Sequence, residues 1–186
     1  MKRILNSILS VLLLAGSCFA ASTGTIELSV TVAPFAEIEV WYQSPGIQSY
    51  DFGTLPVSSS VITEASITVK NSSDGLVEDW YIRASDAYGV SQNWSLSSSP
   101  GVGAFELRAI LNGNVKPSDS DFDVSADDLT NTNQAMTSTN FAGNETGEAV
   151  NPGETRGLWF RITTPTEVSE TSQHTIWVTI VAAEAG

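Results

Sequence analysis

Apolar side chains recur at every second position near the C-terminal end of this chain, and this spacing restricts the fold more than any other feature. The alternation runs through residues 158–163 and again through residues 176–182. A period of two in β-branched and aromatic residues is typical of strands with one buried face. The connection 164–174 is polar and contains Pro165, so we expect the two strands to form a hairpin. The side chains expected to point inward are Leu158, Phe160, Ile162, Ile176, Val178, Ile180 and Ala182.

Further segments with the same alternation occur before residue 112. They lie at 25–32, 35–41, 62–70, 77–85, 94–96 and 104–111. No long helical pattern follows residue 20. Because every strand has a single apolar face, two sheets must pack face to face to bury them. We therefore expect an all-β fold: an antiparallel two-sheet β-sandwich, Ig-like or jelly-roll-like.

Residues 1–20 have the organisation of a signal peptide. Lys2 and Arg3 precede an apolar core at 4–14, and the small residue Ala20 offers a cleavage site. This core is shorter than the roughly 20 apolar residues that a membrane-spanning helix needs. We expect no membrane insertion once the signal is removed. An alternative processing site would leave Cys18 as a lipid-anchored N-terminus, since the residues before it loosely resemble a lipobox.

Cleavage after Ala20 leaves 186 − 20 = 166 residues, which is enough for a single domain at 21–186. The expected location is secreted, extracellular or periplasmic. The chain has a net charge of −13, and loss of Lys2 and Arg3 makes it −13 − 2 = −15. Such a surface repels nucleic acid and anionic membranes. Cys18 is the only cysteine, so cleavage would also remove disulfides, thiol catalysis and thiolate metal sites.

Residues 112–153 form one long insertion that is rich in Asp, Asn, Ser and Thr. Loops of this length inside a domain are uncommon and often functional. In an extended segment Asp119, Asp121 and Asp123 would share one face and could bind Ca²⁺, which takes about six to eight oxygen ligands. The alternative is a solvated acidic loop with Phe122 docked inward.

An EF-hand is excluded, because Val124 and Thr130 stand where a loop beginning at Asp119 would need Gly and Glu. Two apolar pairs, Ala135-Met136 and Phe141-Ala142, are expected to pin the insertion to the core.

The chain offers no recognisable catalytic machinery. His174 is its only histidine, whereas a triad needs an oriented base and a zinc site needs several His or Cys ligands. We expect His174 at the surface or at a strand edge. The prediction is therefore a protein without enzyme activity, and without a cofactor other than the Ca²⁺ considered above.

Tryptophans offer a different kind of site. Trp41, Trp159 and Trp177 fall on the face opposite the apolar row of their predicted strands. If those strands were neighbours, the three indoles could line one exposed face and stack against a glycan. The alternative is that the tryptophans pack beneath the insertion 112–153.

Three stretches together resemble a group of uncharacterised secreted bacterial proteins with an Ig-like β-sandwich. They are YDFGT at 50–54 with ASITVKN at 65–71, then 128–147, and then PGETRGLWF at 152–160. The resemblance implies an exported β-sandwich. It implies no chemistry, so no functional residue is carried over from it.

These observations favour an exported, non-enzymatic structural or interaction protein of the cell surface or extracellular matrix, with itself or other surface proteins as partners. A self-assembling form is suggested by the segment 25–32, which could leave its own sheet and complete that of a neighbour. The competing prediction is a carbohydrate- or Ca²⁺-binding β-sandwich module.

Overall fold

The computed structural model describes residues 36–186. The predicted signal peptide 1–20, Cys18 and the strand predicted at 25–32 lie outside these residues. The described strands are β1 (Ile38–Tyr42), β2 (Ser60–Ile62), β3 (Ile67–Asn71), β4 (Glu78–Tyr88), β5 (Asn93–Leu96), β6 (Ala104–Leu111), β7 (Gln134–Ala135), β8 (Thr155–Thr163) and β9 (Thr175–Glu184). One turn of 3₁₀ helix, η1, covers Asp119–Asp121.

The described chain is all-β, as the alternation predicts, and residues 36–186 contain no α-helix. Within the same residues, no helix has the length and apolar character required to cross a membrane.

The strands are connected in one mixed sheet in the order β1-β3-β8-β6-β5-β4, with β2 also on β8 and with β7 and β9 on β4. The described strand pairs are antiparallel except for β5 and β6, which run parallel over two residue pairs. β5 therefore bridges two antiparallel groups, and the sheet nearly closes on itself. This connection differs from the prediction of two separate antiparallel sheets, because β5 pairs with β4 on one side and with β6 on the other.

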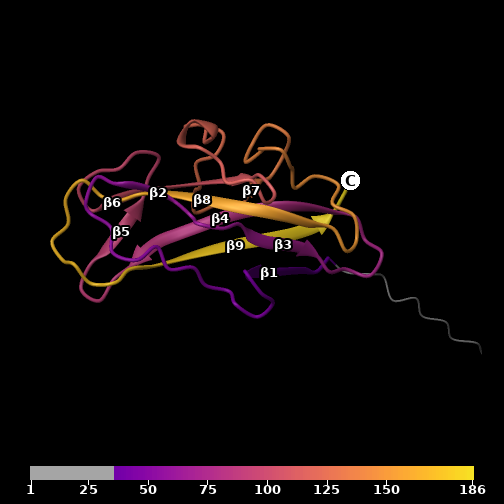
Figure 1. The fold of residues 1–186 in the computed structure, drawn as a ribbon, viewed down its shortest axis with the longest axis horizontal. Helices are drawn as coiled ribbons and strands as arrows, with labels where there is room; N and C mark the ends of the chain where they lie inside the picture. Colours follow the sequence, from indigo (N-terminus) through magenta and orange to yellow (C-terminus); the bar gives the residue numbers. More distant parts are fainter. Residues whose placement is uncertain (1–35) are drawn as a thin grey trace, which may run out of the picture. The chain divides into compact units, whose positions relative to one another are not determined.

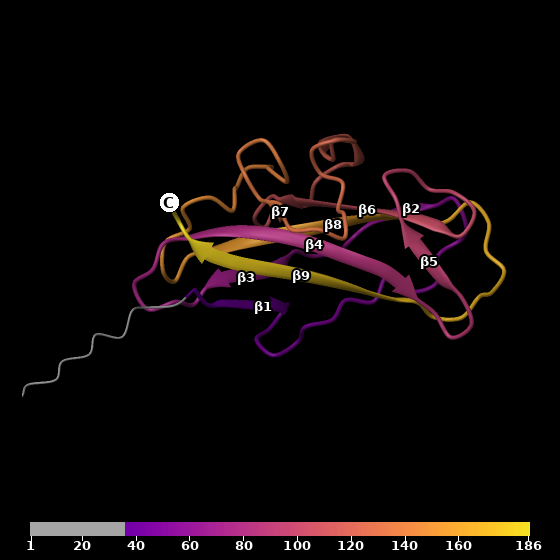
Figure 2. The same cartoon turned by 180° about the vertical axis from the view of Figure 1, so that it is seen from behind.

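The predicted C-terminal hairpin is wrong, although both of its strands exist. β8 is occupied on one side by β6 and on the other by β2 and β3. No edge of β8 is left for β9, which pairs along the length of β4 instead (Figures 1 and 2). The connection 164–174 therefore carries the chain from one group of strands to the other.

Both groups of strands contribute to one core. Leu158, Phe160 and Ile162 of β8 are buried as predicted, and they belong to the same cluster as Trp80 and Ile82 of β4. In Figure 2, β4 passes in front of β8. Alternation thus identified the inward face correctly on these strands, because successive side chains must point to opposite faces.

Val178 of β9 is an exception and is 36% exposed. It lies opposite Ala84, where the register of β4 and β9 shifts between Ala84 and Ala87. This β-bulge inserts one extra residue into β4. Val178 shares the face of Ala84, which is 3% exposed, so its predicted face is right but its predicted burial is wrong.

The insertion 112–153 closes the space between β6 and β4. Its backbone bonds β6, with Leu129 N donating to Leu107 O and Leu111 N donating to Phe141 O, both at 2.9 Å. It also bonds β4, with Met136 N donating to Trp80 O at 2.9 Å. Met136 and Phe141 are 1% and 0% exposed, so the predicted anchors are confirmed. The loops of this segment lie together at the top of Figures 1 and 2.

Candidate functional site

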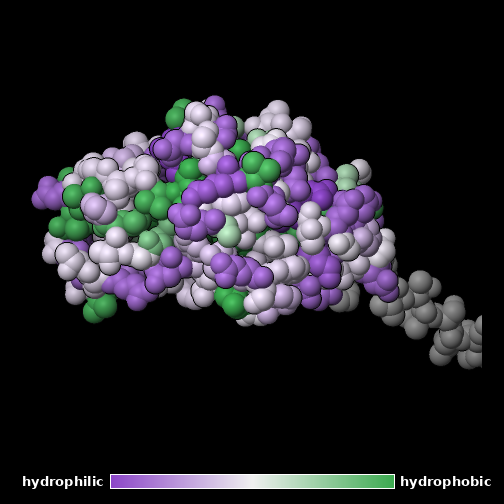
Figure 3. All heavy atoms as spheres, viewed as in Figure 1, coloured by the Kyte–Doolittle hydropathy of each residue, from purple (hydrophilic) through white to green (hydrophobic). Residues whose placement is uncertain are grey.

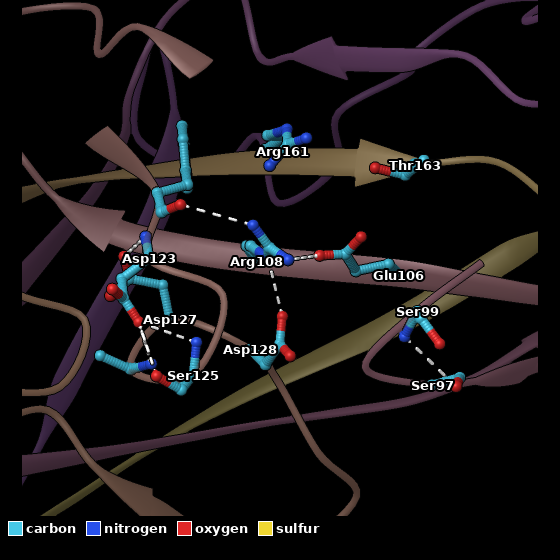
Figure 4. A network of polar contacts seen from close by, with 12 residues as sticks. Ser97, Ser99, Glu106, Arg108, Asp123, Ser125, Asp127, Asp128, Arg161 and Thr163 are labelled. Atoms are coloured by element: carbon cyan, nitrogen blue, oxygen red, sulfur yellow. Dashed lines mark hydrogen bonds and ion pairs between the residues drawn. The ribbon is translucent and has the colours of Figure 1, made fainter. Parts of the chain in front are cut away.

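The first candidate is a buried ionic network on β6 (Figure 4). The Arg108 guanidinium contacts the Glu106 carboxylate, and its Nε lies 2.8 Å from Asp128 Oδ1. The three side chains are 7%, 7% and 11% exposed. Ion pairs removed from water in this way must be closely matched, because each charge has lost its hydration.

The network follows from the strand period and from the insertion. Glu106 and Arg108 are two residues apart and so share the outer face of β6. Asp128 comes from the insertion, where it forms an isolated bridge with Arg108. Arg161 lies opposite Arg108 on β8 and pairs with Asp119 at 3.2 Å. Two adjacent arginines therefore hold two carboxylates of the insertion against the sheet.

Burial and hydrogen bonding shift several carboxyl groups of this region in opposite directions. Burial raises the pKa of Glu106, although the neighbouring Arg108 opposes the shift. Burial likewise raises the pKa of Asp127, whose Oδ1 accepts from Phe141 N at 3.0 Å. The backbone N–H groups of Ser125 and Ala126 lower the pKa of Asp123 to about 2. The described contacts of the network join protein groups to one another, so its evident role is to attach the insertion.

The predicted Ca²⁺ ligands do not converge. Asp119 pairs with Arg161, Asp121 accepts from Ser118 N at 2.7 Å, and Asp123 accepts from Ser125 N at 2.8 Å. Throughout residues 36–186, no group of three or more His, Cys, Asp or Glu side chains could hold a metal ion. Ca²⁺ binding by Asp119, Asp121 and Asp123 therefore stays a prediction from the sequence. The docking of Phe122 is observed, at 4% exposure.

Replacing Asp123 with alanine is expected to lower the melting temperature at neutral pH by an amount that shrinks as the solution is acidified. The folded pKa of about 2 lies below the ordinary aspartate value of 3.8. Ionised Asp123 therefore stabilises the fold above that ordinary value, and its contribution is lost as the pH falls through the folded value. Melting curves of both proteins between about pH 7 and pH 2 test this. Asp74→Ala, at an exposed turn position, is the control; a pH-independent difference for Asp123→Ala would contradict the argument.

The three predicted tryptophans occupy different environments. Trp159 is 3% exposed, donates its indole N–H to Gly113 O at 2.9 Å, and packs with Ile110 and Phe122. It therefore lies beneath the insertion, as the alternative prediction stated. Trp41 is half-buried on β1, whereas Trp177 on β9 is 66% exposed. The structure thus provides no single face of three indoles.

Trp177 borders an open depression of about 280 Å³ on the outer face of β4 and β9. The bulge residues Ser85 and Asp86 form part of its wall, and Trp177 N donates to Ser85 Oγ at 3.0 Å. Tyr88, 50% exposed, brings a second aromatic ring. Sequence reasoning missed every lining residue except Trp177, because the strand pairing and the bulge bring them together.

No family model matches this chain, and no curated protein matches it.

Several other exposed apolar side chains lie in loops. Val57, Val90 and Val102 are 48%, 87% and 76% exposed and precede β2, β5 and β6. Figure 3 shows hydrophobic side chains gathered at the end of the molecule that holds β5 and the start of β6. At the same end the His174 ring stacks on Trp94, with the ring centroids 3.8 Å apart. His174 thereby ties the connection 164–174 to β5.

Proposed function

We propose that this protein is exported and acts without enzyme activity, as a self-associating structural subunit of the cell surface or extracellular matrix. The observation that carries the proposal is an incomplete seam in the sheet. The insertion 112–153 closes the space between β6 and β4, but no comparable segment among residues 36–186 covers the free sides of β1 and β9. Export is supported by the signal-peptide organisation of residues 1–20.

The seam leaves backbone groups and apolar side chains partly uncovered. Within the described residues, β1 pairs only with β3 and β9 pairs only with β4. Ile38 and Val40 of β1 and Ile180 of β9 pack on the core but remain half-buried, whereas Leu158 of β8 is 0% exposed. Unpaired edge strands of this kind accept an added strand readily.

The occupant that we propose for the seam is the segment 25–32 of a neighbouring copy. Its alternation suits a strand with one face on a core. Glu37 N donates to Glu78 Oε1 at 2.8 Å, and Glu37 O accepts from Ser72 N at 2.8 Å. These two hydrogen bonds fix the backbone at Glu37. The segment 25–32 could therefore pair with β1 of its own chain only if the chain reversed its direction around Pro34. Donation to a neighbour requires no such reversal.

We also propose that the two groups of strands correspond to the layers of an Ig-like sandwich. The shared core supports this, since Phe105 and Leu158 of one group pack in the same cluster as Trp80 and Ile82 of the other. In this arrangement the donated strand would extend a layer at its edge.

Deleting residues 22–33 is expected to abolish self-association and to leave a folded monomer. Light scattering after size-exclusion chromatography measures the mass, and circular dichroism in the far ultraviolet checks the fold. A peptide of residues 22–33 should bind the deletion variant saturably. The control is the same peptide with Ile26, Leu28, Val30 and Val32 replaced by serine. A full-length mature chain that stays monomeric at every concentration overturns the proposal, as does a deletion variant that unfolds or still polymerises.

A further inference from the structure

The depression beside Trp177 has a construction that the proposed assembly does not use. It lies on the outer face of β4 and β9, where Arg83 and Thr179 are cross-strand partners. The seam in the sheet lies along the opposite side of β9, away from β4. A ligand in the depression would therefore contact side chains on the face of the sheet, while an added strand would contact backbone groups at its edge.

Aromatic rings are the first feature that points to a ligand. Trp177 is 66% exposed and Tyr88 is 50% exposed, and both line the depression. The two side chains bring an indole ring and a phenol ring to the same depression. Their flat apolar faces, each with one polar group, suit the C–H face of a sugar ring.

Polar groups around the rings are the second feature. The depression is also lined by Arg83, Asp86, Asn131 and Thr179, which together offer donors and acceptors for hydroxyl groups. Asp86 is held in place because its Oδ1 accepts from Leu96 N at 2.9 Å. Arg83 forms no ion pair with any residue in 36–186. Aromatic walls with a few oriented polar groups are the usual composition of a small-ligand site.

The β-bulge is the third feature. The register shift between Ala84 and Ala87 places Ser85 and Asp86 at the wall of the depression. Ser85 Oγ accepts from Trp177 N at 3.0 Å and donates to Asp86 O at 2.7 Å. Bulges are over-represented at sheet edges and next to functional sites, where they redirect side chains. Here the bulge connects the exposed indole to the strand that carries Arg83.

We propose that this depression binds a neutral glycan, with one sugar ring stacked on Trp177 and its hydroxyl groups bonded to Arg83 and Asn131. Acidic glycans fit less well for two reasons. The Asp86 carboxylate lies in the same depression and would repel a uronate or sulfate group. The chain as a whole carries a net charge of −13, which disfavours a polyanion at any distance within the screening length.

The test is isothermal titration calorimetry of the mature chain against soluble neutral glucans, mannans, galactans and chitin oligosaccharides, with polyuronates as the acidic arm. At least one neutral glycan should bind. Trp177→Ala should weaken that binding by at least tenfold, the factor that about 1.4 kcal/mol represents. Trp177→Phe should lose less, since it keeps an aromatic ring. Trp41→Phe, outside the depression, should bind as the unaltered chain does.

Each result decides the proposal. Unchanged melting temperatures in the Trp177 variants would show that lost binding is not lost folding, as expected for a side chain this exposed. Binding that survives in Trp177→Ala, a flat response to all neutral glycans, or binding of polyuronates alone would overturn it. The variant lacking residues 22–33 should bind the glycan as the mature chain does, so failure of the assembly proposal and failure of this one are distinguishable.

Discussion

Replacing Arg108 with alanine is expected to lower the free energy of unfolding by about 3–5 kcal/mol, the cost of removing one partner of a buried ion pair. The Glu106 carboxylate of β6 and the Asp128 carboxylate of the insertion would remain buried without the guanidinium that contacts both. Lowering the pH should partly restore the variant. Burial already raises the folded pKa of Glu106 above 4.5, so protonation favours the folded state, and that stabilisation is lost as the pH rises through the raised value. Urea unfolding at several pH values measures both effects.

Lys116→Ala is the matched control, because it also removes a cation paired with a glutamate. Lys116 Nζ lies 2.9 Å from Glu64 Oε2, and the two side chains are 43% and 74% exposed. An exposed pair of this kind contributes about 0–1 kcal/mol. Replacing Glu106, Arg108 and Asp128 together with apolar residues of similar size should cost far less than Arg108→Ala alone. An Arg108→Ala variant as stable as Lys116→Ala would show that the network does not hold the insertion.

Phe141→Ala is expected to cost about 3–5 kcal/mol, the usual range for a phenylalanine removed from a core. Phe141 is 0% exposed and belongs to the main cluster, although it lies in the polar insertion. Phe141 has a φ of 60°, a value that is equally unfavourable for alanine and phenylalanine. The substitution therefore tests the packing of the side chain and not the strain of the backbone. The loss should be seen in urea unfolding and as faster proteolysis within residues 112–153.

Val124→Ala is the control for that change, since Val124 belongs to the same insertion and is 67% exposed. Its effect should stay within about 0.5 kcal/mol. If Phe141→Ala unfolds no more easily than Val124→Ala, the insertion is an appended loop and the closed space between β6 and β4 has another cause.

Strand positions were predictable where a segment buries one face. Leu158, Phe160 and Ile162 point into the core because alternate side chains of a strand cannot share a face. Phe141 was recognisable as an anchor because it is an aromatic residue in a polar stretch. Val178 shares the face of the buried Ala84 but is 36% exposed, because alternation assigns a face and does not say whether anything covers it. The alternation of apolar residues in β9 does not show which strand pairs with it.

Candidate sites were less predictable. Asp119, Asp121 and Asp123 alternate along the chain, but η1 begins at Asp119 and the segment is not extended. Their carboxylates therefore meet Arg161, Ser118 and Ser125 separately. The sequence offered Trp177 either as part of an exposed aromatic face or as packed beneath the insertion. Its neighbours Arg83 and Tyr88 were not predicted, because they depend on which strand lies beside β9.

By itself, the amino-acid sequence determined that the chain is all-β, which side chains of most strands face inward, and where the polar insertion is pinned. These properties follow from local spacing, which a strand converts directly into faces. Only the tertiary structure decided that β9 pairs with β4, that β5 links the two groups, and that Arg108 lies between two carboxylates. Those outcomes depend on which strand edges are already paired when distant segments of the chain meet. The spacing of apolar residues within one strand does not determine this.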